Sequence, residues 1–111
     1  MGILKRIRYW RRWKADLSTS SAAEILVRLP ARHAVVVGKA SHAKWLIFDC
    51  PCDQGHRVML NLDPENRPLW RITESYPLTL YPSVDERSSV GHCHYVVRDG
   101  YVRWIERTDH R

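Results

Sequence analysis

Two short segments of this chain, about forty residues apart, contain all three of its cysteines and several of its histidines and acids. The first runs from Asp49 to His56 and reads Asp-Cys-Pro-Cys-Asp-Gln-Gly-His, and the second is His92-Cys93-His94. Thiolates and imidazoles are the ligands that zinc prefers in a tetrahedral site, and one such ion cross-links distant strands of a small domain. We therefore predict that the two segments are halves of one zinc site.

The first segment is suited to present two thiols together. Cys50 and Cys52 are two residues apart, so in extended backbone their side chains point to the same side. Pro51 removes an amide from any strand ladder, and we expect the chain to leave its sheet at that point. The alternative interpretations are that the cysteines are small buried apolar residues, or that they form a reactive or redox-active thiol site.

We predict the metal ligands to be Cys50, Cys52, Cys93 and His94, with His56 as an alternative. Adjacent residues of a regular strand face opposite ways, so the use of both Cys93 and His94 needs a bulge or a loop there. Two other ligand sets are possible. In the first, His56 joins the three cysteines. In the second, His92 and His94 complete the Cys50/Cys52 pair from one face.

Residues 31–106 carry β patterns, and we predict a mainly β fold, a small zinc-stabilised antiparallel domain. Asp99-Gly100 lies between two alternating arms and predicts a tight hairpin turn. Residues 85–91 read as a polar loop that leads into the second cysteine segment, and residues 18–30 as a linker or short helix. The predicted strands are Ala34–Val37, Lys44–Phe48, His56–Leu62, Leu69–Thr73, Leu78–Tyr81 and the two arms of a hairpin over 94–105.

The first 17 residues predict a basic amphipathic helix, with apolar residues recurring at roughly helical spacing. The net charge of +6 comes from residues 1–14, which hold six Lys and Arg and no acid, because the other 12 Lys and Arg balance 12 acids. The helix could dock on the domain or a partner, contact phosphates of nucleic acid or of an acidic membrane surface, or remain a disordered tail. The cations available for phosphate contact are Lys5, Arg6, Arg8, Arg11, Arg12 and Lys14.

At 111 residues the chain has the length of one domain. No apolar run approaches the roughly 20 residues needed to cross a bilayer, and the N-terminus lacks the pattern of a secretory signal. An odd number of cysteines, three, fits a reducing compartment better than a disulfide framework. We therefore expect a soluble protein of the cytoplasm.

Several stretches together resemble a family of small bacterial proteins that carry a predicted zinc-binding domain of unknown function. The resemblance covers about residues 25–105. Many members of that family have Cys-x-Cys-Gly-Cys at the first cluster and Cys-x2-His at the second. Cys50, Cys52 and His94 match this pattern, whereas Gln54 and Gly91 replace the other two cysteines. The stretches that carry the resemblance are Lys44–Cys52, Val58–Leu62, Pro68–Thr73, Leu80–Val84 and Cys93–Trp104.

The resemblance implies a metal site in which Cys93 or His56 supplies the missing ligand. It also implies protein partners, because some family members are encoded beside ubiquitin-like modifiers and E1-like, E2-like and JAB-peptidase-like genes. The expected partners are therefore a ubiquitin-like modifier or an E1-like or E2-like protein.

Three classes of function follow. The leading hypothesis is a non-enzymatic, zinc-stabilised adaptor that binds another protein, because four Cys and His ligands leave no open position for an activated water. The second is a binder of nucleic acid or membrane through residues 1–17. The third is an enzyme, either a metal-dependent hydrolase or a Cys/His enzyme, although no His-Glu-x2-His motif is present. The residues available to such an enzyme are Asp49, Asp53, His56, Cys93 and His94. A two-zinc RING-like ligase is disfavoured because the chain does not offer the eight ligands that it needs.

Overall fold

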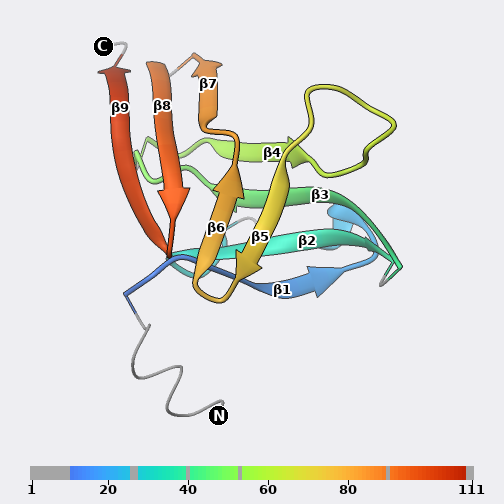
Figure 1. The fold of residues 1–111 in the computed structure, drawn as a ribbon. Helices are drawn as coiled ribbons and strands as arrows, with labels where there is room; N and C mark the ends of the chain where they lie inside the picture. Colours follow the sequence, from blue (N-terminus) through green and yellow to red (C-terminus); the bar gives the residue numbers. More distant parts are fainter. Residues whose placement is uncertain (1–10, 26–27, 40, 53, 90, 110–111) are drawn as a thin grey trace.

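A computed structural model describes residues 11–25, 28–39, 41–52, 54–89 and 91–109, and the chain there is mainly β, as predicted (Figure 1). These residues contain nine strands and one short 3-10 helix, and they contain no α-helix. Nor does any helix in these ranges have the length and apolarity to cross a membrane. The strands are β1 (Lys14–Thr19), β2 (His33–Lys39), β3 (His42–Asp49), β4 (Arg57–Asn61), β5 (Arg71–Ser75), β6 (Leu78–Tyr81), β7 (Val84–Ser88), β8 (Gly91–Arg98) and β9 (Tyr101–Asp109).

The first four strands form one sheet in chain order, and β1 runs parallel to β2 while the other neighbours are antiparallel. The strands within residues 31–106 pair in antiparallel fashion, as predicted, and the parallel pair is made by β1, which precedes that range. The helix predicted over residues 1–17 is wrong over residues 14–17, which lie in β1. There, backbone pairing with β2 and burial of Lys14 against the sheet outweigh the helical spacing of the apolar residues. The part of the predicted helix in residues 1–10 lies outside the described residues.

The segment after β1 contains the 3-10 helix, Ala22–Glu24, within the predicted linker. Ser21 caps it, because its Oγ accepts a hydrogen bond from the Ala23 N–H at 3.2 Å. The sheet that starts at β1 thus begins on the N-terminal side of residue 31, where we expected the β domain to begin.

The four-stranded sheet is covered on both faces, which explains why β2 and β3 read as continuous apolar runs. Leu46 and Phe48 face a core that includes residues of all three sheets, such as Leu80 and Tyr95. Ile47, on the opposite face, packs in a second cluster. That second cluster contains Leu29, Val35, Val37 and Ile47, with Leu17, Ile25 and Trp45 packed around it.

The other two sheets are antiparallel: a β5–β6 hairpin and a three-stranded sheet ordered β7–β8–β9. The prediction of a polar loop over residues 85–91 is wrong, because Val84–Ser88 form β7 and pair with β8. The sequence of β7 contains a single apolar residue, so its strand character comes from pairing with β8 and from burial of Val84.

The predicted β8–β9 hairpin is confirmed, and its turn is a junction of three segments. Asp99 and Gly100 have positive φ values of 54° and 79°, as a tight turn requires. Gly100 N–H donates to the Leu78 carbonyl at 2.7 Å and its own carbonyl accepts from the Trp13 N–H at 2.8 Å. A Cβ on Gly100 would lie 2.5 Å from Arg12 Cβ, so only glycine fits this approach.

Candidate functional sites

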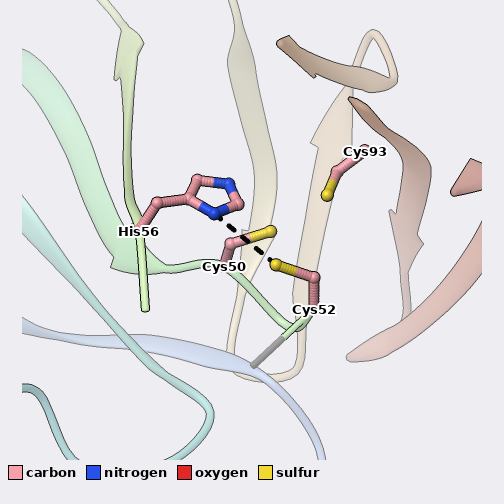
Figure 2. Close-up of side chains that lie close together, drawn as sticks. All are labelled: Cys50, Cys52, His56 and Cys93. Atoms are coloured by element: carbon pink, nitrogen blue, oxygen red, sulfur yellow. Dashed lines mark hydrogen bonds between the residues drawn. The ribbon is translucent and has the colours of Figure 1, made fainter. Parts of the chain in front are cut away.

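Four side chains, Cys50, Cys52, His56 and Cys93, form one group whose possible ligand atoms all lie within 4.8 Å of one another (Figure 2). We call it the Cys/His group. Cys50, Cys52 and His56 belong to the connection between β3 and β4, and Cys93 belongs to β8. The Cys50 N–H donates to the His56 carbonyl at 2.9 Å, which closes the connection into a tight loop. The group therefore joins the four-stranded sheet to the three-stranded sheet.

The chemistry and spacing of the Cys/His group fit a tetrahedral ion. His56 Nδ1 lies 3.5 Å from Cys52 Sγ, close to the roughly 3.6 Å that follows from zinc–sulfur and zinc–nitrogen bonds at tetrahedral angles. His56 Nε2 is buried and has no hydrogen-bond partner among the described residues. Because Nδ1 is the ring nitrogen that faces the thiols, it is the one that would bind a metal ion, and Nε2 would remain for a hydrogen bond of the kind that ligating histidines usually make through their second nitrogen. The residues thus fit a Cys3His metal site, and zinc is the ion that this donor set favours.

When no cation is bound, burial keeps side chains of the Cys/His group in their neutral forms. It raises the pKa of the Cys50 thiol to about 12, and it also raises the pKa of Cys93. It lowers the pKa of His56, which favours the neutral imidazole that binds metals. Neutral thiols in this pocket can become thiolates only if a positive charge replaces their protons, which is what a bound metal ion supplies.

A buried tyrosine contacts one thiol of the group from β8. Tyr95 is fully buried, and its Oη lies 3.7 Å from Cys50 Sγ. Burial, with the adjacent thiol adding to it, raises the pKa of Tyr95, so the phenol keeps its proton. A phenol O–H in this position can donate to the Cys50 sulfur, as outer groups around metal ligands commonly do.

The structure does not bring His94, the fourth ligand that we preferred, into the Cys/His group; His56, the alternative, lies there instead. Cys93 and His94 alternate along β8, so their side chains lie on opposite faces. A register shift does occur next to His94, between it and Tyr95, but it leaves this alternation intact at Cys93. His92 shares the face of His94 and is also absent from the group.

His94 instead contacts a serine. Its Nε2 lies 2.9 Å from Ser83 Oγ, and we call these two residues the Ser–His pair. Ser83 directly precedes β7, where the buried side chain of Val84 anchors the chain and the Trp70 Nε1–H donates to the Ser83 carbonyl at 3.2 Å. Ser83 and His94 are both half-buried, so the hydroxyl is held in place and still reachable. When Nε2 is the unprotonated nitrogen, the Ser83 hydroxyl donates to it, as in activated serine nucleophiles.

The same face of the sheet carries further polar groups. His92 Nε2 lies 2.5 Å from Asp85 Oδ1, and His92 Nδ1 lies 3.2 Å from Glu106 Oε1. The hydrogen bond with His92 is the main cause that lowers the pKa of Asp85, and the charge of nearby His94 adds to it. Asp85 is the cross-strand partner of His94, yet its carboxylate is hydrogen-bonded to His92. The described residues therefore contain a Ser–His pair without a carboxylate bonded to the histidine.

The basic N-terminal residues are only partly described, since Lys5, Arg6 and Arg8 lie outside the described residues. Lys14 is buried in β1 and lies near the Tyr76 ring. The other two are Arg11, which is exposed, and Arg12, whose Nη1 lies 3.2 Å from Asp99 Oδ2.

Sequence reasoning assigned no role to Ser83. It lies in the Leu80–Val84 stretch that carries the family resemblance. Recognition of β7 as a strand would have pointed to this serine. If residues 84–88 are a strand antiparallel to β8, alternation places Ser83, Asp85 and His94 on one face.

Comparison with known protein families gives a match over most of the chain. The model of a family described as bacterial ubiquitination-like system serine protease (BubE) matches residues 21–105. That range includes the Cys/His group and the Ser–His pair. No significant match was found among curated proteins or among solved structures.

Proposed function

This chain belongs to the BubE family of bacterial ubiquitination-like system serine proteases, and we propose that it is a serine peptidase whose nucleophile is Ser83. The observation that carries the proposal is the 2.9 Å contact between Ser83 Oγ and His94 Nε2. A hydroxyl is a weak nucleophile until a base accepts its proton, and histidine is the commonest such base.

In the proposed reaction, Ser83 Oγ attacks the carbonyl carbon of a peptide bond while His94 Nε2 takes the hydroxyl proton. His94 then gives this proton to the departing amine, which leaves an ester between Ser83 and the acyl part of the substrate. Water, deprotonated by the same nitrogen, hydrolyses the ester and restores the hydroxyl. The polar face formed by Asp85, His92 and Glu106 lies beside the pair and supplies its electrostatic surroundings.

The role we propose for the Cys/His group is structural. Cys50, Cys52, His56 and Cys93 would hold one zinc ion, which supplies a cross-link between the β3–β4 connection and β8. Four protein ligands leave no position for a substrate or a water. The group would thereby fix β8, the strand that also carries His94.

The substrate that the family name suggests is a protein of the ubiquitination-like system, and a ubiquitin-like modifier with residues beyond its conjugating C-terminus is the first to test. We place the reaction in the cytoplasm, where three thiols remain reduced. The sequence had favoured a non-enzymatic adaptor. The Ser–His pair favours a peptidase that also binds such partners, because it provides an activated nucleophile that the adaptor role does not need.

The direct test is cleavage of a bacterial ubiquitin-like modifier that carries a C-terminal extension, followed by mass spectrometry. We expect the metal-loaded wild type to release the extension and Ser83→Ala to do so at least about a thousandfold more slowly. Ser89→Ala, an exposed serine in the turn after β7, is the matched control and should cleave normally. If Ser83→Ala retains wild-type cleavage, the proposed nucleophile is wrong. If no variant cleaves but the wild type binds the modifier, the adaptor role is favoured.

A further inference from the structure

A second site lies apart from the Ser–His pair. A cavity with a volume of about 780 Å³ opens between the segment that leads into β2 and the β3–β4 connection. This size is in the range of pockets that hold small ligands or a few residues of a peptide. Among the described residues, its lining is Trp13, Arg28 to His33, Asp49 to Pro51, Gly55 and His56.

Positive charge dominates the lining of this cavity. Arg28 and Arg32 supply two guanidinium groups, and neither has an ion-pair partner within the described ranges. The one carboxylate in the described lining, that of Asp49, is already engaged. Its Oδ1 accepts from Arg57 Nε at 3.0 Å and its Oδ2 accepts from the Leu29 N–H at 3.1 Å. The two arginines are therefore left without a counter-charge from this wall.

Arg32 is held in an unusual state. Its φ is +63°, in the left-handed region that non-glycine residues seldom adopt, and its carbonyl accepts from the Lys14 N–H at 3.0 Å. Its Nε is buried and has no hydrogen-bond partner among the described residues. A buried charged donor without an acceptor is costly, and an anion bound in the cavity would relieve that cost.

Lys14 and His33 lie close to these arginines. Burial is the main cause that lowers the pKa of Lys14, the charge of Asp16 opposes this shift, and the charge of Arg32 adds to it by a smaller amount. His33, also in the lining, is paired with Asp16, 2.7 Å from its Nδ1. The cations at this end of β1 and β2 thus exceed the acids that face them.

We propose that this cavity binds an oxyanion, a carboxylate or a phosphate group, between Arg28 and Arg32, with the apolar part of the ligand against Trp13 and Leu29. Guanidinium groups bind both anions through paired, charge-assisted hydrogen bonds. The proposal does not depend on peptidase activity, because neither Ser83 nor His94 lines the cavity. In a peptidase the cavity would act as a separate site that recognises an acidic group of the substrate.

The test is isothermal titration of the metal-loaded, full-length protein with inorganic phosphate and, in parallel, with succinate, at constant ionic strength set with chloride. We expect saturable binding of at least one probe with one site per chain. Phosphate binding alone assigns a phosphate-bearing ligand, succinate binding alone assigns a carboxylate, and binding of both supports an oxyanion site of either kind.

Variants connect the binding to the two arginines. Arg32→Asn keeps a residue that tolerates positive φ, and we expect it to weaken binding about tenfold or more. Arg28→Gln, at an exposed position where folding is not at risk, should weaken binding several-fold. Arg103→Gln, an exposed arginine of β9, is the matched control and should bind as the wild type. Absence of saturable binding of both probes, or wild-type affinity in Arg28→Gln, would overturn the proposal.

Discussion

The two faces of β8 carry opposite kinds of chemistry within two adjacent residues. Cys93 faces inward, where it belongs to the Cys/His group, whose three cysteines are buried. His94 faces the other way, where it contacts a half-buried serine beside two carboxylates. A closed site of four ligands suits a structural ion, whereas a reachable hydroxyl on a base suits a reaction. Alternation along one strand is enough to separate the two roles.

The contrast also explains how one face can support the other. The inward face joins β8 to the β3–β4 connection through Cys93, and Tyr95 packs in the core two residues further along. A strand held on one face in this way presents the residues of its other face with little freedom, and catalytic geometry requires that precision. The comparison thus predicts that variants on the two faces differ in which property they lose.

The largest effect is expected on the inward face. Cys93→Ser removes one thiolate, and we expect loss of bound zinc together with a fall in the free energy of unfolding on the order of 5 kcal/mol or more. Elemental analysis and urea unfolding of the purified variant measure both quantities. Wild-type zinc content and stability in this variant would show that Cys93 is only a buried apolar residue.

The next effect concerns the outward face. Ser83→Ala should lower the rate of peptide-bond cleavage by about 10³ to 10⁴ and leave zinc content and the midpoint of thermal unfolding unchanged, because Ser83 is not a member of the Cys/His group and shares a face with His94 rather than with Cys93. Kinetics on an extended ubiquitin-like modifier and calorimetry give the two readouts. Parallel loss of stability and activity would mean that the two faces are not separable.

A pair of histidine variants sharpens the comparison. We expect His94→Gln to reduce cleavage by about 10² to 10⁴ while the protein retains its zinc. In contrast, His56→Gln should weaken zinc binding by on the order of a hundredfold or more, because it removes a ligand. Zinc competition with a chromophoric chelator and cleavage rates, measured on both variants, provide the test. The reverse outcome, with zinc lost from His94→Gln, would restore the ligand set that we first preferred.

The smallest effect is expected at Tyr95. Tyr95→Phe removes the hydroxyl that lies 3.7 Å from Cys50 Sγ, and it should cost about 1 kcal/mol of stability. The aromatic ring still fills the core, so the fold and the cleavage rate should be retained. Urea unfolding with zinc present measures the difference. An effect above about 3 kcal/mol would indicate that this phenol is more than one hydrogen-bond donor to the group.

The sequence predicts the β3–β4 and β8–β9 hairpins well, because each combines β-branched or alternating residues with a clear turn signal. It also predicts the meeting of the two cysteine segments. The choice between His56 and His94 as the fourth ligand depends on how the β3–β4 loop closes and on strict alternation in β8. Both are features of the folded structure that the sequence pattern did not reveal.

Two elements could not be predicted for a common reason. The parallel pairing of β1 and the strand character of β7 both arise from contacts with a neighbouring strand, and their own residues favour other structures. The Ser–His pair depends on the position of β7, so a sequence analysis that misses this strand also misses the pair. The role of Ser83 becomes visible only when β7 and β8 are aligned.

The central claim is that Ser83 is an activated nucleophile, and covalent labelling tests it most directly. The metal-loaded protein is treated with a fluorophosphonate, which reacts with activated serines, and its intact mass and peptide map are measured. We predict one adduct per chain, located on Ser83, absent from Ser83→Ala and strongly reduced in His94→Gln. An unlabelled wild-type protein, or an adduct that persists in Ser83→Ala, would contradict the account.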